Sequence, residues 1–237
     1  MYRINRLIES NISAWFKQLD ESASLKRKPR ENKPYVTISR DAGAYGITVA
    51  QMLAEYLSRH ERRKEAVWAV FDKGLIGKVV DEHKLPEKYE KYFGESAMPA
   101  IQDIMEDLLH VHPPHESMIR QMSESIYYLA RVGYSIIIGR GGNIITRSIP
   151  KGLRVRLIGS FENRVAHMQE FLKVGEKEAR EYVLREDKDR RDYIKKYFHK
   201  DIDDVSLYDL VINSDTIALE DIVMILGDTV LKGKGKQ

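Results

Sequence analysis

Five short runs that favour β-strands alternate with helical patterns over most of this 237-residue chain. The runs are Tyr35–Ser39, Val67–Phe71, Ser135–Ile138, Arg154–Gly159 and Tyr208–Ile212. Three of them are almost continuously apolar, as expected for strands that helices cover on both faces of a sheet. This alternation predicts right-handed crossovers and therefore an α/β fold built on a five-stranded parallel sheet.

The segment 86–133, between the second and third runs, holds helical patterns and no strand. We interpret it as a helical insertion that covers a bound substrate. Ligands of parallel sheets collect at the carboxyl ends of the strands, so the residues that follow each strand are the candidate sites.

The N-terminal part of the chain is predicted to lie outside the sheet domain. Residues 1–22 have an amphipathic helical pattern, residues 23–34 form a polar, basic linker, and the domain spans 35–237. The apolar stripe of this helix needs a partner. Its own domain or a second copy of the chain would serve. A peripheral contact with an anionic membrane surface is the alternative, since Trp15, Phe16 and a basic cluster suit such an interface.

The composition excludes several function classes. The absence of cysteine rules out disulfides, thiolate metal sites and cysteine nucleophiles, and makes a cytoplasmic location the natural expectation. No apolar run is long enough to span a membrane. A net charge of +3, from 39 basic and 36 acidic residues, does not indicate a nucleic-acid partner.

The turn after the first strand has features of a phosphate-binding loop. Gly43 and Gly46 permit close approach of an anion to the backbone, and the Thr48 hydroxyl lies one turn into the following helical pattern. The segment does not match the full motif G-x-x-x-x-G-K-[ST]. An ordinary strand–turn–helix corner would explain these residues equally well.

Two other segments carry arginines suited to phosphate. Arg140 follows the third strand between glycines, where its planar fork could bind phosphate oxygens or form a structural ion pair. The run REDKDRR at 185–191 is typical of a solvated helix face, or of a mobile lid that brings Arg185 and Arg191 over phosphates.

Taken in order, these segments resemble the cytidylate kinase family of nucleoside monophosphate kinases, and in particular its divergent bacterial branch. The resemblance covers residues 35–231. It rests on the stretches ISRDAGAYG, FDKGLI, IIGRGGNII, LRVRLIGSFENRVAHMQE, REDKDRRDYIKKYF and SLYDLVINSDTIALEDIVMIL.

The resemblance implies a P-loop kinase fold with an acceptor-binding insertion and a lid at about 175–200. It implies ATP and Mg²⁺ as cofactors, and a nucleoside monophosphate such as CMP or dCMP, or another small phosphorylated molecule, as acceptor. The residues it implies for the donor phosphates are Arg40, Gly43, Ala44, Tyr45, Gly46, Ile47 and Thr48. Those for the acceptor are Asp72, Lys78 and Arg140, and the catalytic cations are Arg40, Arg140, Arg185 and Arg191.

The chain departs from the family pattern at several of these positions. Gly46 stands where the family carries its loop lysine, Lys78 replaces an arginine, and Ile138 and Gly141 replace aspartates of cytidylate kinases proper. We hypothesise that Arg40 supplies the missing charge. The metal ligands are not identified. The departures keep open the alternative of a weak or inactive nucleotide- or anion-binding module with an assembly role.

Overall fold

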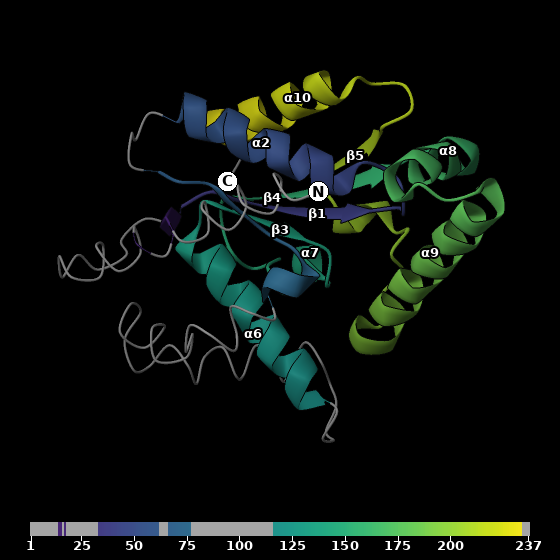
Figure 1. The fold of residues 1–237 in the computed structure, drawn as a ribbon. Helices are drawn as coiled ribbons and strands as arrows, with labels where there is room; N and C mark the ends of the chain where they lie inside the picture. Colours follow the sequence, from purple (N-terminus) through teal and green to yellow (C-terminus); the bar gives the residue numbers. More distant parts are fainter. Residues whose placement is uncertain (1–13, 16, 18–32, 62–65, 77–115, 234–237) are drawn as a thin grey trace, which may run out of the picture.

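Five parallel strands form one sheet in the order β2-β3-β1-β4-β5, as the computed structural model shows (Figure 1). The structure describes residues 14–15, 17, 33–61, 66–76 and 116–233. The strands are β1 (Tyr35–Arg40), β2 (Ala69–Phe71), β3 (Ser135–Ile138), β4 (Gly152–Ile158) and β5 (Leu210–Asn213). The predicted five-stranded α/β sheet is confirmed.

Helices cover both faces of this sheet (Figure 1). On one face lie α2 (Gly46–His60) and α10 (Leu219–Lys232), which contact each other. On the other face lie α6 (Glu116–Val132) and the single turn α7 (Gly142–Ile145). Beyond the carboxyl ends of the strands pack α8 (Phe161–Leu172) and α9 (Glu176–Phe198), and the 3₁₀ turn η1 (Val205–Leu207) precedes β5.

The central strand β1 is buried along almost its whole length and pairs with β3 on one side and β4 on the other. Its first residue, Tyr35, lies opposite Gly152, where a Cβ would stand 2.1 Å from the Tyr35 ring. The ring occupies that space, and its hydroxyl donates to the carbonyl oxygens of Thr146 and Ile149. These contacts hold the central strand in place. Because β1 and β3 are adjacent, the loops that follow them lie side by side.

Among the described residues of the N-terminal segment, Trp15 contributes its side chain to this core. Trp15 is helical and 2% exposed, its Nε1 donates to the Gly133 carbonyl at 3.1 Å, and its ring meets Phe71 edge-on at 5.3 Å. The Trp15 ring is therefore not available to a membrane surface, contrary to the alternative drawn from the sequence. Phe16 and linker residues 23–32 lie outside the described residues.

Of the predicted insertion, the structure describes only the part from residue 116 onward, which is α6. Within the described residues, none of the helices combines the length and apolarity that crossing a bilayer requires.

Candidate functional site

The turn between β1 and α2 has the backbone of a loop that can receive an anion. Gly43 has φ +84° and Tyr45, just before α2, has φ +56°. A Cβ at Gly43 would lie 2.6 Å from the Arg164 carbonyl oxygen, so only glycine fits this approach to α8. No side chain caps the start of α2. The first amides of this helix can therefore serve a ligand, as such amides do at phosphate sites.

Helix α8 holds the outer side of this loop through two successive carbonyl groups. Arg164 donates from Nη1 to the Ala42 oxygen at 2.9 Å, and His167 Nδ1 lies 2.7 Å from the Gly43 oxygen. Because a carbonyl only accepts, His167 must carry its proton on Nδ1 here. The His167 ring also stacks on Tyr45 at 3.8 Å. With the Ala42 carbonyl facing α8, the N–H of Gly43 across the same trans peptide points the opposite way.

Helix α9 holds the base of the loop through one carboxylate. Asp187 accepts the Ala42 N–H at 2.7 Å and a hydrogen bond from Arg164 at 2.6 Å. Arg164 is 9% exposed, so its charge is neutralised inside the protein by this partner. The three groups tie α8, α9 and the loop together, and we call Ala42, Arg164 and Asp187 the lid–loop clamp.

Arg40, the last residue of β1, sends its side chain across the loop toward the end of β3. A Cβ at Gly46 would lie 2.8 Å from Arg40 Cγ, and one at Gly139 would lie 2.3 Å from Arg40 Nη1. Both glycines leave room for this arginine. Burial, and next the neighbouring Arg190, lower the pKa of Arg40 from the ordinary arginine value to about 9. The surroundings of Arg40 therefore disfavour its charged form, and a bound anion would stabilise that form.

The turn after β3 carries Arg140 in a strained conformation. Gly139, Arg140 and Gly141 all have left-handed backbones, with φ of +73°, +57° and +72°. This region is unfavourable for a residue with a Cβ, and such strain persists mainly at functional sites. The Arg140 guanidinium lies over the Tyr193 ring of α9, 5.2 Å from its centroid.

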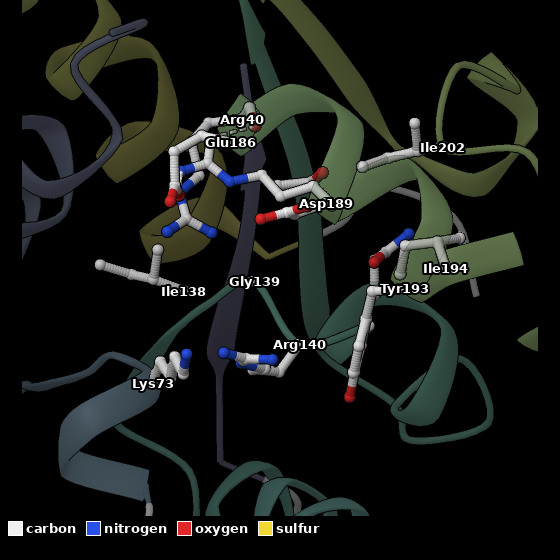
Figure 2. Close-up of a pocket in the computed structure, with 14 residues that line it drawn as sticks. Arg40, Lys73, Ile138, Gly139, Arg140, Glu186, Asp189, Tyr193, Ile194 and Ile202 are labelled. Atoms are coloured by element: carbon white, nitrogen blue, oxygen red, sulfur yellow. Dashed lines mark hydrogen bonds and ion pairs between the residues drawn. The ribbon is translucent and has the colours of Figure 1, made fainter. Parts of the chain in front are cut away.

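One pocket of about 240 Å³ joins these elements. It is lined by Ser39, Arg40, Lys73, Ile138, Gly139, Arg140, Gly141, Asn143, Glu186, Asp189, Arg190, Tyr193, Ile194 and Ile202. Figure 2 shows Lys73 and Arg140 pointing toward one another on one side, with Arg40 and Glu186 on the other. Four cationic side chains and two carboxylates therefore line one pocket at the carboxyl edge of the sheet, and cations in excess favour an anionic ligand.

The structure brings some of the predicted site residues together and leaves others apart. Arg40 and Arg140 share the pocket. Arg185 and Arg191 are exposed on α9 and do not line it: Arg185 lies over the Tyr182 ring, and Arg191 pairs with Asp203 at 3.1 Å. Lys78 lies outside the described residues.

The remaining predicted loop residues lie at the start of α2. Ala44 and Gly46 are buried, whereas Ile47 is 43% exposed and Thr48 is half-buried. Asp72 follows β2 and accepts the Leu75 N–H at 2.9 Å, as a cap for the helical turn 73–76. That contact gives Asp72 a structural role in this structure.

Four pocket residues on α9 were not predicted from the sequence: Glu186, Arg190, Tyr193 and Ile194. Their spacing of three or four residues places them on one helix face, which is the signal the sequence contained. Arg190 donates to the Arg40 carbonyl at 3.2 Å and to Glu186 at 3.1 Å. It is therefore Arg190, rather than Arg185 or Arg191, that reaches this site from α9.

The residues present fit a polyphosphate, because the loop directs the Gly43 N–H away from α8 and Arg40 adds a cation. They do not identify a metal centre. Within the described ranges, no group of three His, Asp or Glu side chains could hold an ion. Asp41 is engaged by Arg156 at 2.9 Å, and burial raises the pKa of its carboxyl.

A protein-family model and solved structures match this chain. A family model described as the cytidylate kinase-like family matches residues 35–216. The crystal structure of an uncharacterized protein from Eubacterium ventriosum is similar, with a TM-score of 0.61 and 20% identity. The match covers 83% of this chain and 99% of that one.

A shikimate kinase from Bacteroides thetaiotaomicron has a TM-score of 0.42 and 11% identity, with 83% of this chain and 98% of that chain covered. None of the curated proteins matches the sequence. The Eubacterium protein supports the fold, and the family model supports the kinase-like class.

Proposed function

Because the chain belongs to the cytidylate kinase-like family, we propose that it transfers a phosphoryl group from ATP to a small phosphorylated acceptor. A nucleoside monophosphate such as CMP or dCMP is the first acceptor to test. The observation that carries the proposal is the convergence of Arg40, Arg140 and Arg190 on one pocket beside the loop between β1 and α2.

Each of these cations has a separate task in the proposed reaction. Arg40 passes over Gly46 and compensates for the lysine that this loop lacks, binding the donor phosphates at the mouth of the loop. Arg140 binds the acceptor phosphate from the end of β3, and Arg190 approaches from α9. Phosphoryl transfer depends mainly on positioning and on neutralising charge, which arginine forks supply. ATP with Mg²⁺ supplies the phosphoryl group and part of the charge compensation when bound.

The other residues position this machinery. The lid–loop clamp fixes the loop against α8 and α9, and His167 adds a hydrogen bond to the Gly43 carbonyl. Ile138, Ile194 and Ile202 give the pocket an apolar wall, which excludes water from the reacting groups. Lys78 is proposed to contact the acceptor.

The test is ADP formation measured with a panel of nucleoside monophosphates and small phosphate esters. Acceptor-dependent turnover that falls at least a hundredfold in Arg140→Ala, by analogy with loss of one transition-state donor, supports the proposal. The control is Lys188→Ala, an exposed cation on α9 that is absent from the pocket lining. Turnover that is independent of every acceptor, or unaffected by Arg140→Ala, would count against it.

A non-catalytic nucleotide- or anion-binding module is the second candidate. One observation favours it: the Arg40 stem fills the space beside Gly46, so the loop has no room for a lysine at that position. This candidate predicts that ATP raises the melting temperature while no ADP forms with any acceptor. Its assembly role would rest on the N-terminal segment and is tested by the oligomeric state in solution.

A further inference from the structure

Asn143, the second residue of α7, places a buried amide in the wall of the pocket. Its side chain is 6% exposed, and its Nδ2 has no hydrogen-bond partner within the described part of the chain. Buried donors in folded proteins are nearly always paired, and an unpaired one destabilises the folded state. A donor without a partner at a pocket wall indicates that its hydrogen-bond acceptor belongs to the ligand.

The backbone around Asn143 is held firmly. A Cβ at Gly142 would lie 3.3 Å from Ile137 and 3.4 Å from Thr37, so α7 packs closely on the sheet. Thr146 closes the turn by donating to the Gly142 carbonyl at 2.7 Å. The backbone that carries Asn143 is therefore fixed on both sides, and only rotation of its side chain can change the partners of its amide.

The same turn carries Arg140, three residues earlier, in its left-handed conformation. The turn after β3 therefore places two different groups in one pocket: a charged guanidinium and a neutral amide donor. A phosphate monoester needs both kinds of group, because its several oxygens accept more hydrogen bonds than one arginine fork can donate. A neutral donor also adds a hydrogen bond without further crowding the cations Arg40 and Arg190.

We propose that Asn143 is an acceptor-binding residue whose Nδ2 donates to a phosphate oxygen of the acceptor while Arg140 binds the same phosphate. This inference rests on the proposed function and adds a residue to its acceptor side. The ligand class is a phosphate monoester, of which inorganic phosphate is the simplest probe. Occupation of the pocket requires a small rotation of the amide, since Nδ2 is covered in the ligand-free protein.

Asn143→Leu tests the proposal, because leucine has a similar shape and removes the unpaired donor. Chemical denaturation of the ligand-free variant should show stability equal to or above that of the wild type. Its dissociation constant for inorganic phosphate should rise about tenfold, the loss of one hydrogen bond to a charged group. Calorimetry is done with the protein saturated by the non-hydrolysable ATP analogue AMP-PNP, so that phosphate is directed to the acceptor side.

Ser123→Ala is the matched control. Ser123 is also buried, at 1% exposure, and its hydroxyl is also unpaired within the described residues, but it is absent from the pocket lining. Its removal should leave phosphate binding unchanged. Asn143→Asp is the second variant: it keeps the shape, replaces the donor by an anionic oxygen, and should weaken phosphate binding further.

The outcomes separate this inference from the proposed function. Unchanged phosphate affinity in Asn143→Leu overturns the role of Asn143. Should that variant fail to fold, unchanged affinity in Asn143→Asp overturns it. A wild-type protein that binds AMP-PNP but no phosphate refutes the acceptor subsite and leaves donor binding standing. A wild type that binds neither refutes both.

Discussion

The Arg40 side chain occupies the space that a side chain at position 46 would need: a Cβ at Gly46 would lie 2.8 Å from Arg40 Cγ. Gly46, which stands where the family carries its loop lysine, is therefore the residue that the aliphatic part of the Arg40 side chain requires. We interpret the pair as one exchange, in which an arginine from the end of β1 replaces the charge of a lysine from the start of α2. The cation then comes from the strand before the loop instead of from the helix after it, and it stays at the loop.

Gly46→Ala should destabilise the protein by about 1–3 kcal/mol, because the new methyl group overlaps the Arg40 stem. The double variant Arg40→Ala/Gly46→Ala should be less destabilised than the two single effects added, with a coupling of at least about 0.5 kcal/mol. Urea denaturation measures all three. Gly175→Ala is the control, since nothing lies within 4 Å of that Cβ position. Additive effects would show that Arg40 does not occupy this space.

Arg40→Met should leave the ligand-free protein as stable as the wild type or more stable, and should abolish the thermal shift with ATP. The pKa of Arg40 is lowered in the folded state, so its charged form disfavours folding. That unfavourable contribution is fully present below about pH 9 and diminishes as the pH rises from there toward 12.5. Differential scanning fluorimetry at pH 7.5 therefore tests the full effect. A destabilised variant that still binds ATP would contradict the assignment.

Arg140→Gly should change stability little, because relief of left-handed strain and the added freedom of the unfolded chain oppose each other at about 1 kcal/mol each. Binding of the acceptor should nevertheless be lost with the guanidinium. Arg140→Lys, which keeps the charge and loses the fork, should recover part of it. Calorimetric titration of phosphate into these variants decides the point. Full binding by Arg140→Gly would remove this residue from the site.

Asp187→Ala should destabilise the protein by about 3–5 kcal/mol, because it leaves the Arg164 guanidinium buried without its counter-ion. It should also weaken ATP binding, since the Ala42 amide loses the partner that anchors the loop to α9. Asp192→Ala on the same helix removes an exposed pair and should leave stability nearly unchanged. Equal effects of the two substitutions in guanidinium denaturation would refute the lid–loop clamp.

Trp15→Ala should destabilise the protein by about 3–5 kcal/mol, as expected for removal of a large buried ring from a core. Trp15→Phe should cost less, because it keeps contact with Phe71 and loses the hydrogen bond to Gly133. Lys17→Ala, an exposed helical neighbour, is the control. If Trp15→Ala melts like the wild type, the contacts of Trp15 contribute nothing to the stability of the fold.

Much of the fold could be predicted because burial leaves a local pattern in the sequence. The run Ser135–Ile138 coincides with β3, and the other four runs overlap their strands within two residues at each end. Glycines also flank Arg140 in the sequence, and the structure shows three successive left-handed residues in this turn. Periodicity and turn chemistry act within a few residues, so one sequence suffices to detect them.

The sequence by itself determined the parallel α/β architecture and placed Arg40 and Arg140 at the strand ends where ligands bind. Only the tertiary structure decided that Arg190 faces the pocket while Arg185 and Arg191 do not, and that Asp187 anchors the loop. The physical reason is the distance along the sequence between the residues that interact. The positions of the strands along the chain follow from burial patterns that each segment carries alone, whereas the rotation of α9 is set by its packing against α8 and the loop. Contacts between residues more than a hundred positions apart leave no periodic trace in the chain.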